Sequence, residues 1–135
     1  RDADYASMLA YPPSPMLERW RELYRKTCRR NNNQPDAGRF LLHWLVQAGF
    51  PASAVTMSLE VEPHFSEEDK RSWADGLRER VVKSTFADLA LQFELTNHDE
   101  LQQISQAWAE WPEQPGACFY YVNGEALAVK SPTSV

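Results

Sequence analysis

The sequence predicts an α/β domain, and three observations support this fold class. A helical pattern that ends at Gly49 is followed by residues 55–61, in which apolar and polar side chains alternate as in a strand. A second stretch rich in aromatic and branched residues, 118–130, lies near the end of the chain. The residues between these two stretches have helical spacing. A helix, a short turn and a β-branched strand in succession favour an α/β unit over a helical bundle.

Length and composition restrict the class of protein. The 135 residues suffice for one domain with a hydrophobic core but not for two ordinary ones. Lys and Arg number 14 against 19 Asp and Glu, and this net charge of -5 argues against nucleic acid or an anionic membrane as a partner. No apolar run reaches the roughly 20 residues that cross a membrane, and no leader pattern opens the chain.

The cysteines point to a reducing compartment. Cys28 and Cys118 are far apart and show neither metal-ligand spacing nor a disulfide framework. We therefore expect a cytoplasmic protein without a metal site.

Capping residues and apolar spacing define two helices in the first part of the chain. Ser14 followed by Pro15 is a helix start signal, and the helix should extend from 15 to about 30. Asp36 is expected to cap a second helix, with Gly49 in left-handed geometry at its end. The apolar stripe of the second helix, expected to pack in the core, comprises Phe40, Leu41, Trp44, Leu45 and Ala48.

Several side chains near these helices have structural interpretations. The basic residues near the end of the first helix complement its dipole, and we favour this role over an anion site. They are Arg25, Lys26, Arg29 and Arg30. His43 lies beside the apolar stripe and is interpreted as a structural histidine rather than a base. The aromatic residues on apolar stripes, expected mainly in the core, are Trp20, Tyr24, Trp44, Trp108 and Trp111.

Three further helical stretches precede the C-terminal β-rich segment. Ser66 with Asp69, and Asn97 with Glu100, have the spacing of helix N-terminal capping boxes. A helical stretch near 85–93 lies between the two helices that they open. In the last segment, Asn123-Gly124 is a strong hairpin signal, and the alternative is one long strand with a glycine bulge.

A family resemblance rests on five segments taken in order. The first segment is 1–5, and the second is a helix with Leu17, Trp20 and Tyr24. The third is the stretch 35–39 together with Trp44 and 48–50. The fourth is an insert with Trp73 and Arg80, and the fifth is 119–130 with Gly124-Glu125. In this order they resemble the C-terminal half of class I S-adenosylmethionine-dependent methyltransferases, in the branch similar to ubiquinone/menaquinone-type and to fungal and actinobacterial small-molecule methyltransferases.

The resemblance implies a specific architecture. It is the C-terminal portion of a Rossmann-like fold, with the end of strand 5 and the loop after it, two helices, strand 6, a helical insert and an antiparallel strand 7 or hairpin. The single partial domain divides into an α/β unit at 1–62, a helical insert or lid at 63–112 and a C-terminal strand or hairpin at 113–135. After the sixth strand, where the family is often aromatic, this chain has Glu62-Pro63-His64.

The resemblance also implies S-adenosylmethionine as the cofactor of the complete enzyme. The family binds it with a glycine-rich turn after the first strand, an acidic residue that ends the second, and contacts from the third and fourth strand ends. The glycines of this chain are dispersed and form no such turn. They are Gly38, Gly49, Gly76, Gly116 and Gly124. We expect the cofactor-binding half to lie outside this chain and the chain alone to be inactive.

Five residues are candidates for binding a small-molecule substrate: Tyr5, Tyr11, His64, Trp73 and Arg80. His64 ends the predicted strand, where α/β folds place ligands. The three aromatic residues could line a pocket for an apolar or aromatic substrate, and packing is the competing interpretation. Arg80 could anchor an acidic group of the substrate or pair with neighbouring carboxylates. No histidine has a recognised catalytic partner by spacing, so the catalytic residues remain unassigned.

Two functional hypotheses follow. The first is the substrate-side and lid portion of a small-molecule methyltransferase, with the cofactor-binding half supplied by a missing segment or a partner chain. The second is a non-catalytic binding or assembly module that pairs with a partner chain or with itself, because a sheet of these strands alone leaves unpaired edges and an uncovered face. Self-association would make the chain a homo-oligomer.

Overall fold

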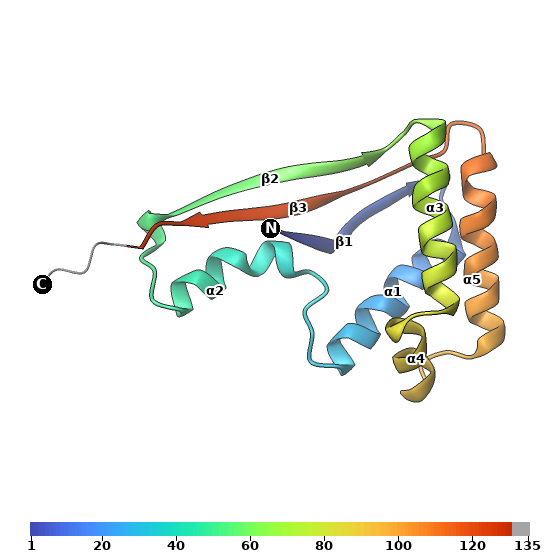
Figure 1. Cartoon of the computed structure of the whole chain (residues 1–135), viewed down its shortest axis with the longest axis horizontal. Coiled ribbons are helices and arrows are strands. Elements are labelled where there is room, and N and C mark those ends of the chain that lie inside the picture. Colours follow the sequence, from blue (N-terminus) through green and yellow to red (C-terminus); the bar gives the residue numbers. More distant parts are fainter. Residues whose placement is uncertain (131–135) are drawn as a thin grey trace, which may run out of the picture.

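A computed structural model describes residues 1–130 and combines a three-stranded sheet with a cluster of helices at one end of the strands (Figure 1). The mixed α/β class is therefore confirmed. The elements are β1 (Asp2–Tyr11), α1 (Pro15–Arg30), η1 (Ala37–Phe40), α2 (Leu41–Gln47), η2 (Ala52–Ala54), β2 (Val55–His64), α3 (Glu67–Val82), α4 (Thr85–Gln92), α5 (His98–Glu110), η3 (Trp111–Glu113) and β3 (Cys118–Ala128).

The last strand occupies the centre of the sheet. The strand order is β1-β3-β2, and β3 is antiparallel to both neighbours, so β1 and β2 run parallel to each other. Of the two alternatives expected at Asn123-Gly124, the structure shows one long strand and not a hairpin, because β3 continues through both residues. Gly124 lies opposite Asp2 on one side and Leu59 on the other. Continuous hydrogen bonding to two neighbours outweighs the local turn preference of Asn-Gly.

The first strand is longer than predicted and is irregular. The strand whose end was expected within 1–5 extends to Tyr11, so Tyr5 and Tyr11 both lie in β1 rather than on a loop after it. The register changes between Asp4, which lies opposite Val122, and Leu9, which lies opposite Tyr120. Three extra residues of β1 are accommodated there as a bulge, since five steps along β1 match two along β3.

Helix starts follow the predicted capping residues closely. The side chains of Ser14, Ser66 and Asn97 accept hydrogen bonds from the backbone N–H groups of Leu17, Asp69 and Glu100. These bonds satisfy N–H groups that have no partner within a helix. The first helix has its predicted bounds, and the stretch near 85–93 forms α4.

The second predicted helix differs from expectation. Asp36 precedes η1, but its side chain makes no capping hydrogen bond. No residue of α2 is buried, Trp44 is 41% exposed, and His43 is exposed rather than a structural core residue. Gly49 has the predicted positive φ, at 106°. The apolar stripe of α2 is therefore not part of the core within residues 1–130.

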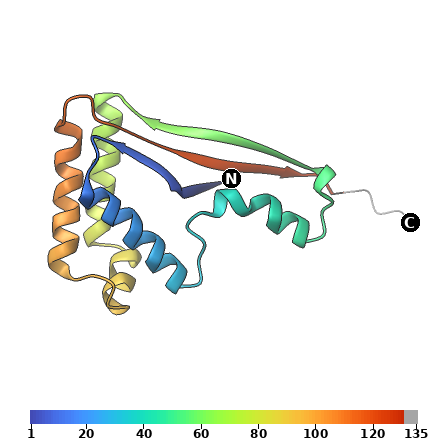
Figure 2. The same cartoon turned by 180° about the vertical axis from the view of Figure 1, so that it is seen from behind.

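The core lies where the helices meet the end of the sheet. Trp108 of α5 is fully buried, and its ring makes edge contacts with Trp20 of α1, Trp111 of η3 and Phe119 of β3 at centroid distances of 5.2, 5.7 and 5.6 Å. These contacts tie sheet and helices together through aromatic packing. Seen from behind, α1, α3, α4 and α5 gather at this end, whereas α2 lies apart beside the rest of the sheet (Figure 2). Among residues 1–130, no helix is long and apolar enough to span a membrane.

Two glycines fix the position of η1 against the sheet. A Cβ on Gly38 would lie 2.7 Å from the carbonyl oxygen of Asp2 and 2.9 Å from the backbone nitrogen of Gly124. A Cβ on Gly124 would lie 2.7 Å from the carbonyl carbon of Gly38. Both positions need glycine because backbone meets backbone there, and backbone cannot rotate away as a side chain can.

Replacing Gly124 by alanine should therefore destabilise the fold by at least about 2 kcal/mol, since the new methyl group overlaps the backbone of Gly38. Denaturant unfolding measures this change. Gly76→Ala is the matched control, because its Cβ would meet only the Arg80 guanidinium at an ordinary 3.5 Å and alanine favours the helix. Equal stability of the Gly124→Ala variant and the parent would contradict the close contact.

Candidate functional site

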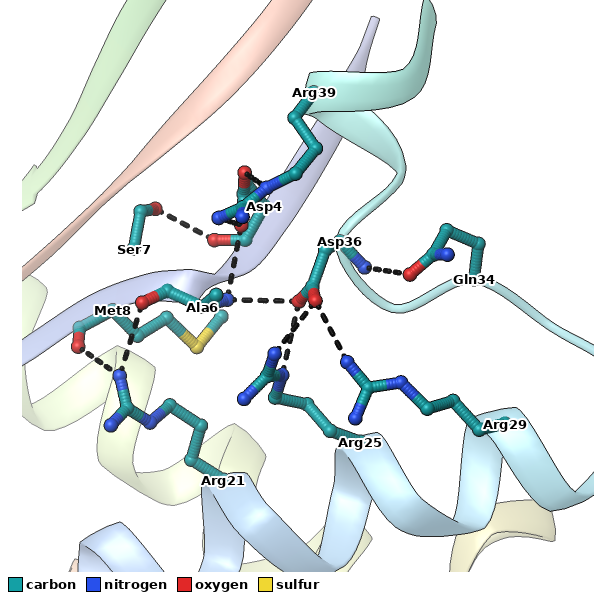
Figure 3. A network of polar contacts seen from close by, with 10 residues as sticks. All are labelled: Asp4, Ala6, Ser7, Met8, Arg21, Arg25, Arg29, Gln34, Asp36 and Arg39. Atoms are coloured by element: carbon teal, nitrogen blue, oxygen red, sulfur yellow. Dashed lines mark hydrogen bonds and ion pairs between the residues drawn. The ribbon is translucent and has the colours of Figure 1, made fainter. Parts of the chain in front are cut away.

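A buried carboxylate connects the bulge of β1 to the first helix (Figure 3). The Asp36 side chain is only 5% exposed. It accepts hydrogen bonds from Arg25 at 2.8 and 3.1 Å, from Arg29 at 3.1 Å and from the backbone N–H of Ala6 at 3.0 Å. The fork of Arg25 matches both carboxylate oxygens, the strongest geometry for such a pair. Asp36 thus holds β1, α1 and the loop before η1 at one point.

Other polar groups complete the support of the bulge (Figure 3). The Arg21 guanidinium donates to the carbonyl oxygens of Ala6 and Met8 at 3.2 and 3.0 Å. The Ser7 hydroxyl donates to the carbonyl oxygen of Asp4 at 2.6 Å and accepts from the Val122 N–H at 2.9 Å. These bonds replace the strand hydrogen bonds that a bulge removes. These hydrogen bonds therefore fix the conformation of the irregular segment of β1.

Electrostatics favour the ionised form of Asp36. Burial alone disfavours the charged carboxylate, but the hydrogen bonds and positive charge of Arg25, with the Ala6 N–H and Arg29, outweigh it and lower the pKa of Asp36. Asp36 therefore pairs with two of the four basic residues at the end of α1, Arg25 and Arg29, while Lys26 pairs with Glu22 and Arg30 lies over the ring of Phe93.

A cavity of about 280 Å³ opens beside the bulge, between β1, α1, α3 and the start of α4. This volume lies just below the ~300 to 1,000 Å³ of typical small-molecule sites, so it suits a small ligand. Its walls are mainly apolar and aromatic. They comprise Tyr5, Trp20, Tyr24, Leu77, Arg80, Val81, Ser84, Thr85 and Phe86.

Stacked aromatic rings form one wall of this cavity. The rings of Tyr5 and Tyr24 stack at a centroid distance of 4.3 Å, and Phe86 lies 5.3 Å from Tyr24. Burial raises the pKa of both tyrosines. Both hydroxyls are therefore neutral at physiological pH and can donate or accept a hydrogen bond.

Arg80 contributes the positive charge of the cavity. Its positive charge lowers the pKa of Tyr5 and Tyr121, although burial is the larger influence and raises both pKa values overall. Two of the five predicted substrate residues, Tyr5 and Arg80, thus line one cavity.

His64 and Trp73 are brought together, but in a packed layer beside the cavity. Their rings stack at 4.2 Å, with Tyr121 5.8 Å from Trp73. The Nδ1 atom of His64 lies 3.0 Å from a carboxylate oxygen of Asp69. Among the described residues, His64 Nε2 and Trp73 Nε1 are buried without a hydrogen-bond partner. Neither residue lines the cavity, so their arrangement supports packing more directly than ligand contact.

Tyr11 is separate from the other predicted residues. It is 54% exposed, and its backbone carbonyl accepts a hydrogen bond from the Trp111 indole at 3.0 Å. Conversely, Tyr24, Ser84, Thr85 and Phe86 line the cavity but were not among the predicted site residues. For Ser84, Thr85 and Phe86 the one sequence signal was position: Ser84 caps α4, and α4 follows directly on the helix that carries Arg80.

The described residues do not fit S-adenosylmethionine. Gly38 and Gly124 face each other's backbone and leave no space for a ligand, while Gly49 and Gly116 have positive φ at turns. No glycine-rich turn follows β1, β2 or β3 within 1–130. The same part of the chain contains no group of acidic, histidine or cysteine side chains that could hold a metal ion.

No protein-family model matches the chain, and no curated protein matches it.

Replacing Asp36 by asparagine should lower the stability at neutral pH by about 2–4 kcal/mol, because two arginines and an N–H lose their shared anion. The parent gains this stability above the unfolded-state pKa of about 3.9 and loses it as pH falls through the lowered native pKa. The variant should therefore show a flatter stability profile in acid, measured by urea unfolding from neutral to acidic pH.

Asp75→Asn is the control for this experiment, because Asp75 is 74% exposed and its bond to Arg78 is long, at 3.8 Å. Exposed pairs of this kind contribute little to stability. Equal losses in the two variants would contradict the special role of Asp36.

Proposed function

We propose that this chain is the substrate-side and lid portion of an S-adenosylmethionine-dependent small-molecule methyltransferase. Residues outside the 135 supply the cofactor-binding half. The chain contributes the cavity that receives the methyl acceptor, and α3 and α4 of the helical insert form part of its wall.

The observation that carries this proposal is the strand arrangement. Two parallel strands, β1 and β2, are joined through helices, and the last strand is antiparallel to both. Parallel strands joined by a helical crossover are characteristic of α/β folds, and the resemblance implies an antiparallel last strand. The helical insert between β2 and β3 lies at the strand ends, where α/β folds bind ligands.

The role of this chain in such a reaction is binding and exclusion of water. Methyl transfer depends on placing the acceptor atom in line with the donor, so positioning accounts for much of the rate. A cavity walled by Trp20, Tyr24 and Phe86 holds an acceptor in a dry environment. The tyrosine hydroxyls and Arg80 supply its polar contacts.

Calorimetry with S-adenosylmethionine tests this proposal. The 135-residue chain should not bind the cofactor, whereas the natural gene product, including any coding sequence in frame before Arg1, should bind it. Binding by the 135 residues alone would overturn the placement of the cofactor site outside the chain. A natural product that fails to bind S-adenosylmethionine would overturn the methyltransferase assignment itself.

A second candidate function is a binding or assembly module, and exposed apolar side chains favour it. Leu59 and Val61 of β2 are 73% and 55% exposed, and Trp44 of α2 is 41% exposed. Leu59 and Val61 lie on the same face of β2, and contiguous exposed apolar surface is typical of an interaction site. Since β2 is also an edge strand, a second copy could cover this surface.

Analytical ultracentrifugation distinguishes this alternative. If the chain assembles through β2, the parent sediments as a dimer or larger species and Leu59→Glu sediments as a monomer. Thr56→Glu is the matched control, because Thr56 is exposed and adjacent residues of a strand alternate between faces. A parent chain that is monomeric at high concentration would contradict self-assembly.

A further inference from the structure

Among residues 1–130, the Arg80 guanidinium has no anionic partner. Of the arginines among residues 1–130, nine have either a carboxylate within 4.0 Å or, for Arg30, the ring of Phe93 beneath the guanidinium. Arg80 has neither, and its one hydrogen bond is from Nε to the carbonyl oxygen of Gly76 at 3.2 Å. In an acidic chain of net charge -5, carboxylates for such pairing are abundant. The unpaired cation lies at the cavity rather than on a remote surface.

Gly76 provides space for this arrangement. It lies inside α3, where glycine is less favourable than alanine by about 1 kcal/mol. The terminal nitrogen of Arg80 lies 3.5 Å from where a Cβ of Gly76 would be. The guanidinium thus lies along α3 over Gly76, with its remaining N–H groups free to meet a ligand.

The rest of the cavity is suited to a flat apolar body. Tyr24 and Phe86 present aromatic surface, with Leu77 and Val81 beside them. The neutral hydroxyls of Tyr5 and Ser84 lie in the same cavity as the cation. No carboxylate of the described chain lines it, so no internal anion competes with a ligand for Arg80.

We propose that this cavity binds a planar aromatic anion, such as an aryl carboxylate, whose ring packs against Tyr24 and Phe86 and whose charge pairs with Arg80. The inference rests on the proposed function only for the role of this ligand as the methyl acceptor. Binding itself can be measured on the 135-residue chain.

The planar guanidinium of an arginine can donate two parallel hydrogen bonds to a carboxylate. Arg80 should therefore favour an anionic ligand over a neutral molecule of equal shape. An aromatic ring without a charge would gain only the apolar contacts. The competing interpretation is that Arg80 only complements the dipole at the end of α3, where it lies in the last turn. That role needs positive charge but no ligand.

The test uses naphthoate and its neutral isostere naphthamide as probes, with calorimetry for affinity and amide NMR shifts for location. We expect naphthoate to bind at least about 10-fold more tightly than naphthamide, the difference expected for hydrogen bonds to a charged group. The shifts should concentrate at Ser84, Thr85 and Phe86, which line the cavity.

Variants of Arg80 separate the two interpretations. Arg80→Gln should weaken naphthoate binding at least about 10-fold and leave naphthamide unchanged. Arg80→Lys keeps the charge at the helix end but loses the fork, so its affinity should fall between parent and Arg80→Gln. Arg78→Gln is the matched control, because Arg78 is on the same helix, pairs with Asp75 and does not line the cavity.

Each of four results would overturn the proposal. They are equal affinity for the two probes, no binding of either probe, amide shifts remote from the cavity, and equal naphthoate affinity in the parent and Arg80→Gln. These results would leave the methyltransferase assignment intact, since a neutral acceptor remains compatible with it. Conversely, failure of the natural gene product to bind S-adenosylmethionine would not alter the affinity of the cavity for naphthoate.

Discussion

The ion pair between the buried Asp36 and the partly buried Arg25 is the interaction on which the candidate site depends. It joins three segments that the chain brings together only after folding: the bulge of β1, the helix α1 and the loop before η1. The bulge carries Tyr5, and α1 carries Tyr24, so the same pair aligns the two stacked rings that form a cavity wall. Removing one charge of such a pair leaves the other without compensation, which makes the arrangement unusually sensitive to single changes.

Local signals predicted local structure. Ser14, Ser66 and Asn97 open their helices as expected, because a cap depends on residues only a few positions away. Asp36 was misassigned as a cap because its partners come from elsewhere in the fold. The choice between a hairpin and one long strand at Asn123-Gly124 stayed open in the sequence for a related reason: β3 gains hydrogen bonds from strands on both sides, and no property of those two residues indicates a central position. Trp44 has an apolar pattern around it but no buried partner in the described chain.

The sequence indicated the aromatic and cationic character of the candidate site better than the set of residues that line it. Tyr5 and Arg80 line the cavity as anticipated, whereas His64 and Trp73 stack beside it and Tyr11 lies elsewhere. Tyr24 and Phe86 come from α1 and α4, which meet only in the folded chain. The periodicity of the sequence therefore does not indicate that they form one wall of the cavity. The exposed apolar surface of β2 lies in a different part of the molecule, so ligand binding and assembly can be tested independently.

The dependence of the cavity on Asp36 is tested most directly by an NMR pH titration of the Asp36 side-chain carboxyl carbon, followed together with the contact between the Tyr5 and Tyr24 rings. We expect a pKa for Asp36 below the ordinary value for aspartate, and loss of the ring contact over the same pH range in which Asp36 is protonated. An ordinary or raised pKa for Asp36, or a ring contact that persists after its protonation, would show that the cavity wall does not depend on this carboxylate.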